Sequence, residues 1–234
     1  MSSTDPLELL TQGAISIKGR MPWSSNVTLL AELALADATG LAVYKPERGE
    51  RPLWDFPPGL YKREVAAYRL SEALGWGLVP LTVLRDDGPL GEGSLQLFIE
   101  ADFEQHYLTL LERPEHREQL QRICLFDLVA NNADRKSGHC LLGPDDRIYA
   151  IDNGLTFHIE PKLRTVIWDF AGEPIPGEML ATIERLLGQG LPAPLVELLE
   201  PDEQRALLAR GKGLLRRGRF PKDASGERYP WPLV

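Results

Sequence analysis

The 234-residue chain has few of the residues that build metal-rich or disulfide-stapled proteins: two cysteines, four histidines and three methionines. Cys124 and Cys140 both stand in apolar stretches, which favours reduced core thiols over a disulfide or a cysteine metal centre. The chain also lacks a basic excess, since its net charge is −8. That balance argues against a general nucleic-acid binder and against attraction to anionic lipid.

Long apolar runs are absent too, because no stretch approaches the ~20 residues that span a bilayer. The first residues are polar and acidic and show no secretory leader. We therefore expect a cytoplasmic protein that has no stable membrane insertion and no nucleic-acid partner.

The chain does contain two aspartates that each directly follow an apolar segment. Asp134 stands in a polar loop directly after an apolar helical stretch, and Asp152 follows 18 residues later, at the end of a short apolar strand. One carboxylate of such a pair can orient or deprotonate a nucleophile while the other holds a metal ion on a phosphate chain. The pair therefore indicates phosphoryl transfer.

Hydrophobic periodicity predicts an α+β fold of two lobes. The first lobe, residues 1–101, is expected to hold a short opening helix capped by Asp5, a five-stranded antiparallel sheet and one longer helix. The second, residues 102–234, is expected to be mostly helical, with a catalytic β-hairpin and a Pro-rich tail. An Asp-Asp-Gly sequence at 86–88 is expected to form the turn between the fourth and fifth strands. The expected strands are 14–18, 27–35, 40–45, 78–84 and 95–99, with 139–142 and 148–152 in the hairpin, and the expected helices are 61–74, 103–112, 115–130, 177–188, 192–199 and 201–217.

Four segments in sequence order resemble the phosphatidylinositol 3-/4-kinase superfamily, whose members have a protein-kinase-like fold, and the type II phosphatidylinositol 4-kinases in particular. Small actinobacterial-type proteins of unknown role look similar as well. The likeness covers residues 13–158 and does not extend to the final third of the chain. The four segments are Tyr44-Lys45-Pro46 for the strand lysine, 93–100 for the hinge strand, Asn132-Ala133-Asp134-Arg135 for the catalytic loop and 150–155 for the metal-binding turn.

The resemblance implies that Lys45 grips the phosphates of ATP. Glu64, in the first half of the helix that follows, is then the partner that holds the ammonium in place. Arg63 and Glu72 are the alternatives if the helix has another register. Without the family likeness, Lys45 is a solvated strand-end lysine and Glu64 a surface glutamate.

The resemblance also implies two contacts between the backbone and the nucleotide. Ser24, Ser25 and Asn26, in the first hairpin connection, would cover the phosphates. The alternative is an ordinary turn, for which Ser and Asn have local preferences. Phe98, Ile99 and Glu100 would form the hinge that binds adenine, and the alternative there is a buried edge strand.

The resemblance implies that Asp134 is the catalytic base and that Arg135 supports its loop. It also implies that Asp152 binds a Mg²⁺ ion that bridges the phosphates. Without it, both aspartates are turn residues. Asp127, in the preceding helix, is expected to be a buried or capping carboxylate.

His139 departs from the family, which usually has a metal-binding asparagine five residues after the catalytic aspartate. A neutral imidazole is a poorer ligand for Mg²⁺ than for softer ions, so the site is expected to bind one metal, to prefer Mn²⁺ or to be catalytically weak, unless His139 is simply a hydrogen-bonded strand residue.

We therefore predict a kinase of the phosphatidylinositol 3-/4-kinase-like type that transfers the γ-phosphate of ATP, with Mg²⁺, to a hydroxyl of a small molecule or a protein. A nucleotide-binding pseudokinase that serves as a regulatory module is the first alternative, and a protein adenylyltransferase is the second. Lipid phosphorylation is not favoured, because segment 156–168 leaves little room for a long substrate loop and no cysteine-rich insertion is present.

Overall fold

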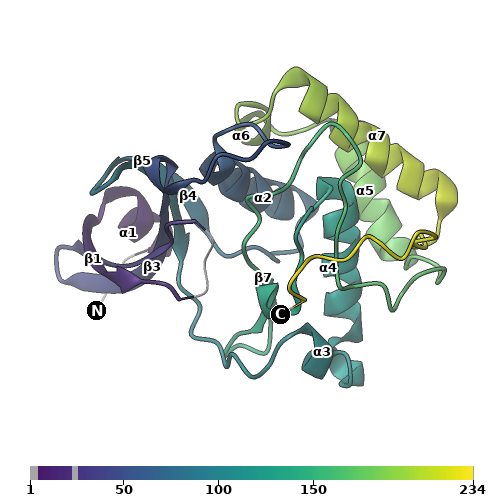
Figure 1. Ribbon diagram of the computed structural model, residues 1–234, viewed down its shortest axis with the longest axis horizontal. Coiled ribbons are helices and arrows are strands. Elements are labelled where there is room, and N and C mark those ends of the chain that lie inside the picture. Colours follow the sequence, from purple (N-terminus) through teal and green to yellow (C-terminus); the bar gives the residue numbers. More distant parts are fainter. Residues whose placement is uncertain (1–4, 23–25, 234) are drawn as a thin grey trace.

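The computed structural model describes residues 5–22 and 26–233, which fold into two lobes, as Figure 1 shows. The N-terminal lobe is built on one sheet of five antiparallel strands in the order β1-β2-β3-β5-β4. The predicted α+β fold with a five-stranded antiparallel sheet is therefore confirmed. The strands are β1 Ala14–Arg20, β2 Leu29–Leu35, β3 Ala38–Pro46, β4 Thr82–Gly88 and β5 Gly91–Leu97.

One face of this sheet is covered by the short opening helix. In β2, alternate residues from Leu29 to Leu33 are buried, as expected of a strand whose two faces meet different surroundings. The buried face packs with the apolar residues of α1 (Pro6–Gln12) in a single cluster. The helix starts where the Asp5 side chain accepts a hydrogen bond from the Leu7 N–H at 2.9 Å, so the predicted cap lies where the sequence placed it.

The helix α2 (Leu60–Leu74) joins the two lobes. It packs on β4 and β5 on one side and on α5 and α6 on the other, and Figure 1 shows it between the sheet and the helices of the second lobe. Because it is covered on several sides, even Arg63 and Glu64 are buried, at 5% and 3% exposure. It ends at Gly75, whose φ of 68° is the left-handed conformation that glycine adopts easily.

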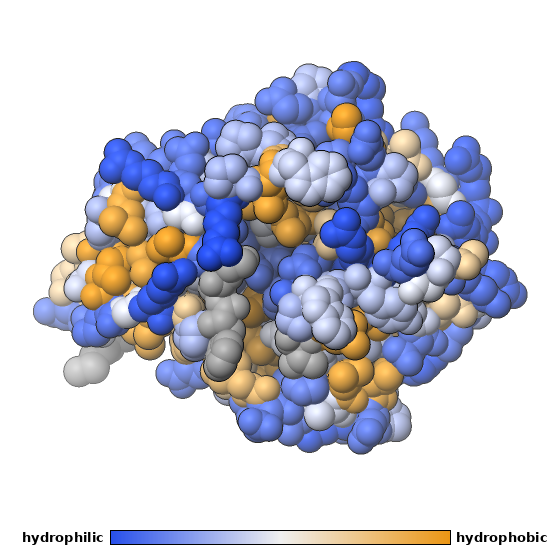
Figure 2. Space-filling view, viewed as in Figure 1, coloured by the Kyte–Doolittle hydropathy of each residue, from blue (hydrophilic) through white to orange (hydrophobic). Residues whose placement is uncertain are grey.

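The C-terminal lobe is organised around α4 (Arg117–Ala130). Four of its side chains, from Leu120 to Phe126, are fully buried in one apolar cluster with residues of the hairpin, α5 and α7. The exposed surface over α7 is mostly hydrophilic in Figure 2, as expected of an amphipathic outer helix. The other elements are α3 Tyr107–Leu110, α5 Gly177–Gln189, α6 Ala193–Val196, α7 Pro201–Arg217, the hairpin strands β6 Cys140–Leu142 and β7 Ile148–Ala150, and the single turns η1 Glu47–Gly49, η2 Pro114–His116 and η3 Ser137–His139.

The hairpin of β4 and β5 is tighter than the sequence predicts. The Asp-Asp-Gly sequence at 86–88 lies inside β4 and not in the turn, and the predicted strand starts at 78 and 95 are each wrong by four residues. The chain reverses between Gly88 and Gly91, where Gly91 has a φ of 94°. Glycine reaches such a φ without steric cost. The Asp-Asp-Gly sequence suggested a turn only because Asp and Gly are generally common in turns.

The predicted helix over 103–112 is reduced to the single turn of α3. The Asp102 side chain accepts a hydrogen bond from the Glu104 N–H at 3.0 Å, a local turn that competes with helix formation. The next predicted helix, 115–130, starts later as α4, because its first residues form the tighter turn η2 after Pro114. The lobe boundary expected at 101–102 lies in the connector before α3 and stays a prediction.

The C-terminal tail crosses the second lobe and returns to its centre (Figure 1). The Thr165 N–H donates to the carbonyl of Arg228 at 3.1 Å, and the Ser137 N–H donates to that of Leu233 at 2.8 Å. The tail therefore lies against the segment that follows α4. Within the described residues, no helix combines the length and the apolar composition that a bilayer span requires.

Candidate active site

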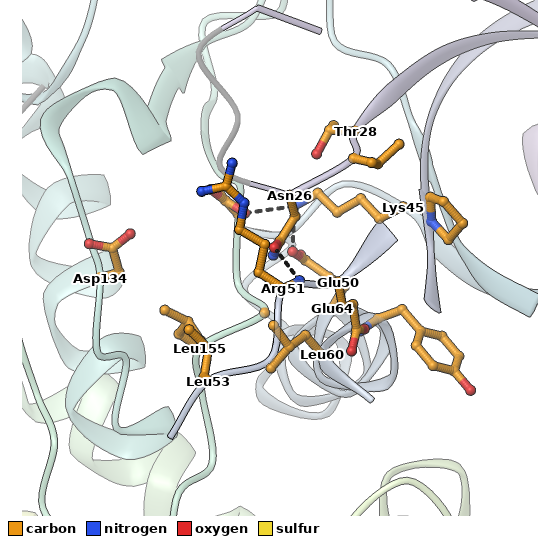
Figure 3. A pocket seen from close by; sticks show the side chains of 15 residues that line it. Asn26, Thr28, Lys45, Glu50, Arg51, Leu53, Leu60, Glu64, Asp134 and Leu155 are labelled. Atoms are coloured by element: carbon orange, nitrogen blue, oxygen red, sulfur yellow. Dashed lines mark hydrogen bonds and ion pairs between the residues drawn. The ribbon is translucent and has the colours of Figure 1, made fainter. Parts of the chain in front are cut away.

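A pocket of about 230 Å³ is lined by five of the side chains that the sequence singled out, namely Asn26, Lys45, Glu64, Asp134 and Asp152. Its walls come from the segment that leads into β2, the end of β3, the loop into α2, α2 itself, the loop after α4 and the turn after β7. Figure 3 shows Asp134 across the pocket from Lys45. The residues lining the pocket are Asn26, Val27, Thr28, Lys45, Pro46, Glu50, Arg51, Leu53, Leu60, Tyr61, Glu64, Asp134, Asp152, Gly154 and Leu155.

Lys45, near the end of β3, bridges two acidic residues. Its Nζ donates to Asp152 Oδ1 at 2.7 Å and also pairs with Glu64 Oε1. Burial alone would lower the pKa of this ammonium, but Asp152 and Glu64 outweigh burial and raise it above its usual range. Lys45 is therefore a firmly charged cation on the pocket wall. Neither Arg63 nor Glu72 takes the place of Glu64.

The Glu64 carboxylate also holds the turn that presents Asp152. Its second oxygen, Oε2, accepts the N–H of Asn153 at 2.9 Å. Asp152 itself has a φ of 56°, which is uncommon for a residue with a side chain, so neighbouring contacts have to stabilise this turn. Lys45 holds the pKa of the Asp152 carboxyl well below its usual range. The half-exposed Asp152 side chain is therefore an anion that faces the pocket.

Asp134 is presented by the loop that ends α4. The helix stops at Asn131, which is left-handed with a φ of 58°, and the Asp134 N–H donates to Asn132 Oδ1 at 2.9 Å. Burial raises the pKa of the Asp134 carboxyl to about 6, against the opposing attraction of Lys136, whose Nζ lies 3.5 Å from Oδ2. A carboxylate with such a pKa is suited to accept a proton near neutral pH.

Sequence reasoning overlooked some residues around this site. Lys136 could have been found, because it is a cation two positions after Asp134 in the same polar loop. Glu50 had no such signal, since it stands in a Pro/Gly-rich loop. Its two carboxylate oxygens accept the N–H groups of Gly59 and Tyr61 at 2.9 and 2.8 Å. Glu50 thereby caps the start of α2 and fixes the loop that borders the pocket.

Arg135 does not line the pocket but supports the site from the protein interior. Its guanidinium is fully buried and contacts both oxygens of Asp127, the closest at 2.9 Å. It also donates to the carbonyl of Ile151 and to Asn153 Oδ1, each at 2.6 Å. Burial raises the pKa of Asp127, while Arg135 opposes that shift. Asp127 is thus the buried carboxylate that the sequence suggested, and the pair connects the Asp134 loop with the Asp152 turn.

His139 lies beside Asp152, with its Nε2 3.4 Å from Oδ2. Burial lowers the pKa of the imidazole to about 4, so the ring is neutral at pH 7. Its Nδ1 is 3.0 Å from the carbonyl of Asp134. The Lys136 N–H also donates to Nδ1 at 3.3 Å. With the proton on Nε2, Nδ1 accepts that bond and the Nε2–H faces Asp152. With the proton on Nδ1, it is donated to the Asp134 carbonyl, and Nε2 keeps a lone pair that a cation could accept.

A neutral nitrogen beside a carboxylate oxygen is a donor set that fits a divalent cation. In the described part of the chain, no group of three or more His, Cys, Asp or Glu side chains is arranged to hold a metal. A metal ion held by Asp152 and His139 would therefore need phosphate oxygens and water as its remaining ligands. That requirement is typical of ions that bind together with a nucleotide.

The other predicted nucleotide contacts are less complete. Ser24 and Ser25 lie outside the described residues. Asn26 does line the pocket, and its Oδ1 accepts the Arg51 N–H at 2.9 Å. Phe98 and Ile99 do not line this pocket, and the Phe98 N–H already donates to the carbonyl of Leu41 at 3.1 Å. The structure therefore brings together the phosphate end of the predicted site and leaves the hinge apart from it.

Comparisons with known proteins give one relative by sequence and several neighbours by structure. No protein-family model matches the chain. A curated relative, "Protein Rv2133c" of Mycobacterium tuberculosis, is 37% identical over 265 aligned residues, which cover 97% of this chain and 95% of the relative.

Solved structures with much lower identity share the architecture. A Golgi casein kinase with Mn/ADP bound has a TM-score of 0.61 at 15% identity, covering 97% of this chain and 79% of that one. Hydra Fam20 with sugar has a TM-score of 0.58 at 14% identity, covering 93% and 91%. The Helicobacter pylori proinflammatory kinase CtkA has a TM-score of 0.54 at 11% identity, covering 90% and 94%. These similarities establish the kinase-like fold.

Proposed function

This chain belongs to the family of Protein Rv2133c from Mycobacterium tuberculosis, and we propose that it is an ATP-dependent phosphotransferase. The observation that carries the proposal is the position of Lys45 between Glu64 and Asp152, with Asp134 on the opposite wall of the same pocket. Phosphoryl transfer needs a cation on the phosphate chain, a carboxylate for the metal and a carboxylate for the incoming hydroxyl. These side chains supply the three groups.

In the proposed reaction, the acceptor hydroxyl oxygen bonds to the γ-phosphorus of ATP while the bond from that phosphorus to the bridging oxygen of ADP breaks. Asp134 orients the hydroxyl and takes its proton. Lys45 neutralises charge on the phosphate chain, and Glu64 keeps it in place. Mg²⁺ bound at Asp152 would supply further positive charge to the phosphates. Arg135 keeps the two aspartates in their relative positions.

Asn26 at the pocket, with Ser24 and Ser25 before it, is proposed to cover the phosphates. Phe98 and Ile99 are proposed to contact adenine through their backbone. The Golgi casein kinase that shares this fold was solved with Mn/ADP, which supports a nucleotide with a divalent ion as the ligand here. We retain Mg²⁺ as the first choice of metal and Mn²⁺ as the second, because His139 offers a nitrogen ligand.

Replacing His139 with asparagine is expected to shift the metal preference about tenfold toward Mg²⁺, since an oxygen donor would replace the nitrogen. The measurement is the ratio of transfer rates with Mg²⁺ and with Mn²⁺. His158→Asn is the matched control, because the His158 ring packs at a tilt against Phe56, with ring centroids 5.1 Å apart, outside the proposed metal site. An unchanged ratio in His139→Asn would mean that His139 is a structural residue.

The acceptor is proposed to be a hydroxyl of a small molecule or a protein, in a kinase of the phosphatidylinositol 3-/4-kinase-like type. A nucleotide-binding pseudokinase is the second candidate, and His139 favours it, because that side chain replaces the usual metal-binding asparagine. Adenylyl transfer is the third candidate, since the same lysine and metal could bind the nucleotide in the reverse direction.

One experiment separates the three candidates. The purified protein is incubated with cell extract and ATP labelled either on the γ- or on the α-phosphate, in parallel with Asp152→Ala. We expect γ-label on an acceptor, no α-label, and loss of transfer in Asp152→Ala, because the metal carboxylate is gone. Incorporation of α-label alone would instead indicate adenylyl transfer. Binding of ATP without either label would indicate a pseudokinase.

A further inference from the structure

A buried ion pair connects α2 with the distant helix α7. Arg63 directly precedes Glu64 on α2, and its Nη2 pairs with Oε1 of Glu203 in the first turn of α7, 140 residues away in sequence. The two side chains are only 7% and 11% exposed. Two charges so far from water remain stable only while they are paired.

The same guanidinium reaches the segment behind Asp152. Arg63 Nη1 donates to the carbonyl of Thr156, and the Thr156 hydroxyl donates to the carbonyl of Asn153 at 2.7 Å. Asn153 is also the residue whose N–H is held by Glu64. From the position next to Glu64, Arg63 therefore contacts α7 directly and the turn of Asp152 through Thr156.

Glu203 is itself held firmly. Its Oε2 accepts the Glu200 N–H at 3.0 Å at the start of α7, and α7 packs on α4 and α5. Figure 1 shows α7 along the outer side of the C-terminal lobe, and none of its residues lines the pocket described above. Its contact with α2 is thus a connection between the site and a helix that takes no part in the chemistry.

We propose that Arg63 and Glu203 are positioning residues that fix the orientation of α2 and thereby hold Glu64 against Lys45. A rotation of α2 that took Glu64 away from Lys45 would also pull Arg63 away from Glu203 and Thr156, leaving buried charges unpaired. Through Glu203, the helix α7 then stabilises the orientation of α2 at the nucleotide site. The inference rests on the proposed function, because the pairing of Lys45 with Glu64 matters for activity only if Lys45 binds phosphates.

The test compares Glu203→Gln with Asp202→Asn by titration of the whole protein with Mg-ATP. Both changes remove one negative charge from the first turn of α7, so the loss of favourable interaction with the helix dipole is shared. Asp202 is exposed and pairs only with Arg205 among the described residues. We expect Glu203→Gln to weaken Mg-ATP binding about tenfold and Asp202→Asn to leave it unchanged. Equal affinities in the two variants would overturn the inference.

A double variant separates positioning from simple stability. Arg63→Met/Glu203→Met replaces the buried pair with apolar side chains of similar length, which commonly restores stability. If the pair positions Glu64, the melting temperature recovers while Mg-ATP binding stays weak. If the affinity recovers together with the melting temperature, the pair is merely structural and the inference fails. This variant also decides the case in which Glu203→Gln does not fold.

Lys45→Met is the reference that tests the proposed function on its own. Failure of the wild-type protein to bind Mg-ATP, or equal binding by wild type and Lys45→Met, would contradict the proposed function. Loss of binding in Lys45→Met with full binding in the Arg63 and Glu203 variants would contradict only the positioning role of Arg63 and Glu203.

Discussion

Replacing Asp134 with asparagine is expected to lower the rate of phosphate transfer by about 10²–10⁴-fold, the usual contribution of a general base. Asparagine keeps the size of the side chain and its place in the loop but cannot take a proton. Asp134 pairs with Lys136 and not with Lys45, so the affinity for Mg-ATP is expected to stay close to that of the wild type. The measurements are the transfer rate at saturating ATP and the dissociation constant for Mg-ATP.

The matched control is Asp146→Asn. Asp146 belongs to the same lobe, lies in the turn between β6 and β7, and is left-handed with a φ of 60°. Asparagine tolerates that conformation well, and the carboxylate is 79% exposed and outside the pocket. We expect this variant to transfer phosphate at the wild-type rate. If Asp134→Asn did so too, the proposed base would be wrong.

The sheet and the long helices could be predicted because their signals are local. Residues of β2 alternate between buried and partly covered positions, and α2 ends at a glycine with a left-handed φ. Asp134 and Asp152 could be singled out for the same reason, since each directly follows an apolar element. Local patterns of this kind survive tertiary packing when the packing agrees with them.

Long-range contacts could not be predicted in this way. The loop from β3 into α2 packs on the segment after Asp152, where Asp55 pairs with Lys162 at 3.2 Å and the Phe56 ring packs at a tilt against His158. The partners are about a hundred residues apart, and neither segment has a regular period. The pairing of Arg63 with Glu203 was missed for the same reason: a charged residue on a predicted helix is usually solvated.

Weak local signals also explain the wrong boundaries. The chain between β5 and α4 contains charged and polar residues whose side chains bond to nearby backbone, so a helix-like composition over 103–112 gave only α3. Weak local signals also limit the prediction of the hinge. A backbone contact with adenine leaves no mark on residue type, so Phe98 and Ile99 rested on the family resemblance and stay a prediction.

Replacing Asp127 with alanine is expected to destabilise the fold by about 3–5 kcal/mol, because it leaves the guanidinium of Arg135 buried without its anion. Both side chains are fully covered, and Arg135 makes its closest contacts with Asp127, Ile151 and Asn153. The measurement is the free energy of unfolding from urea titration. Asp145→Ala is the control, since Asp145 is 45% exposed in the hairpin turn and its loss is expected to cost less than about 1 kcal/mol.

The double variant Asp127→Leu/Arg135→Met shows what the pair does beyond stability. Apolar replacements remove both buried charges together, so much of the lost stability is expected to return. Phosphate transfer is not expected to return, because methionine donates no hydrogen bonds to Ile151 or Asn153 and the turn of Asp152 would lose that support. Recovery of both properties together would mean that the pair only fills the core. Recovery of stability alone would mean that these buried charges keep the metal carboxylate aligned with the base.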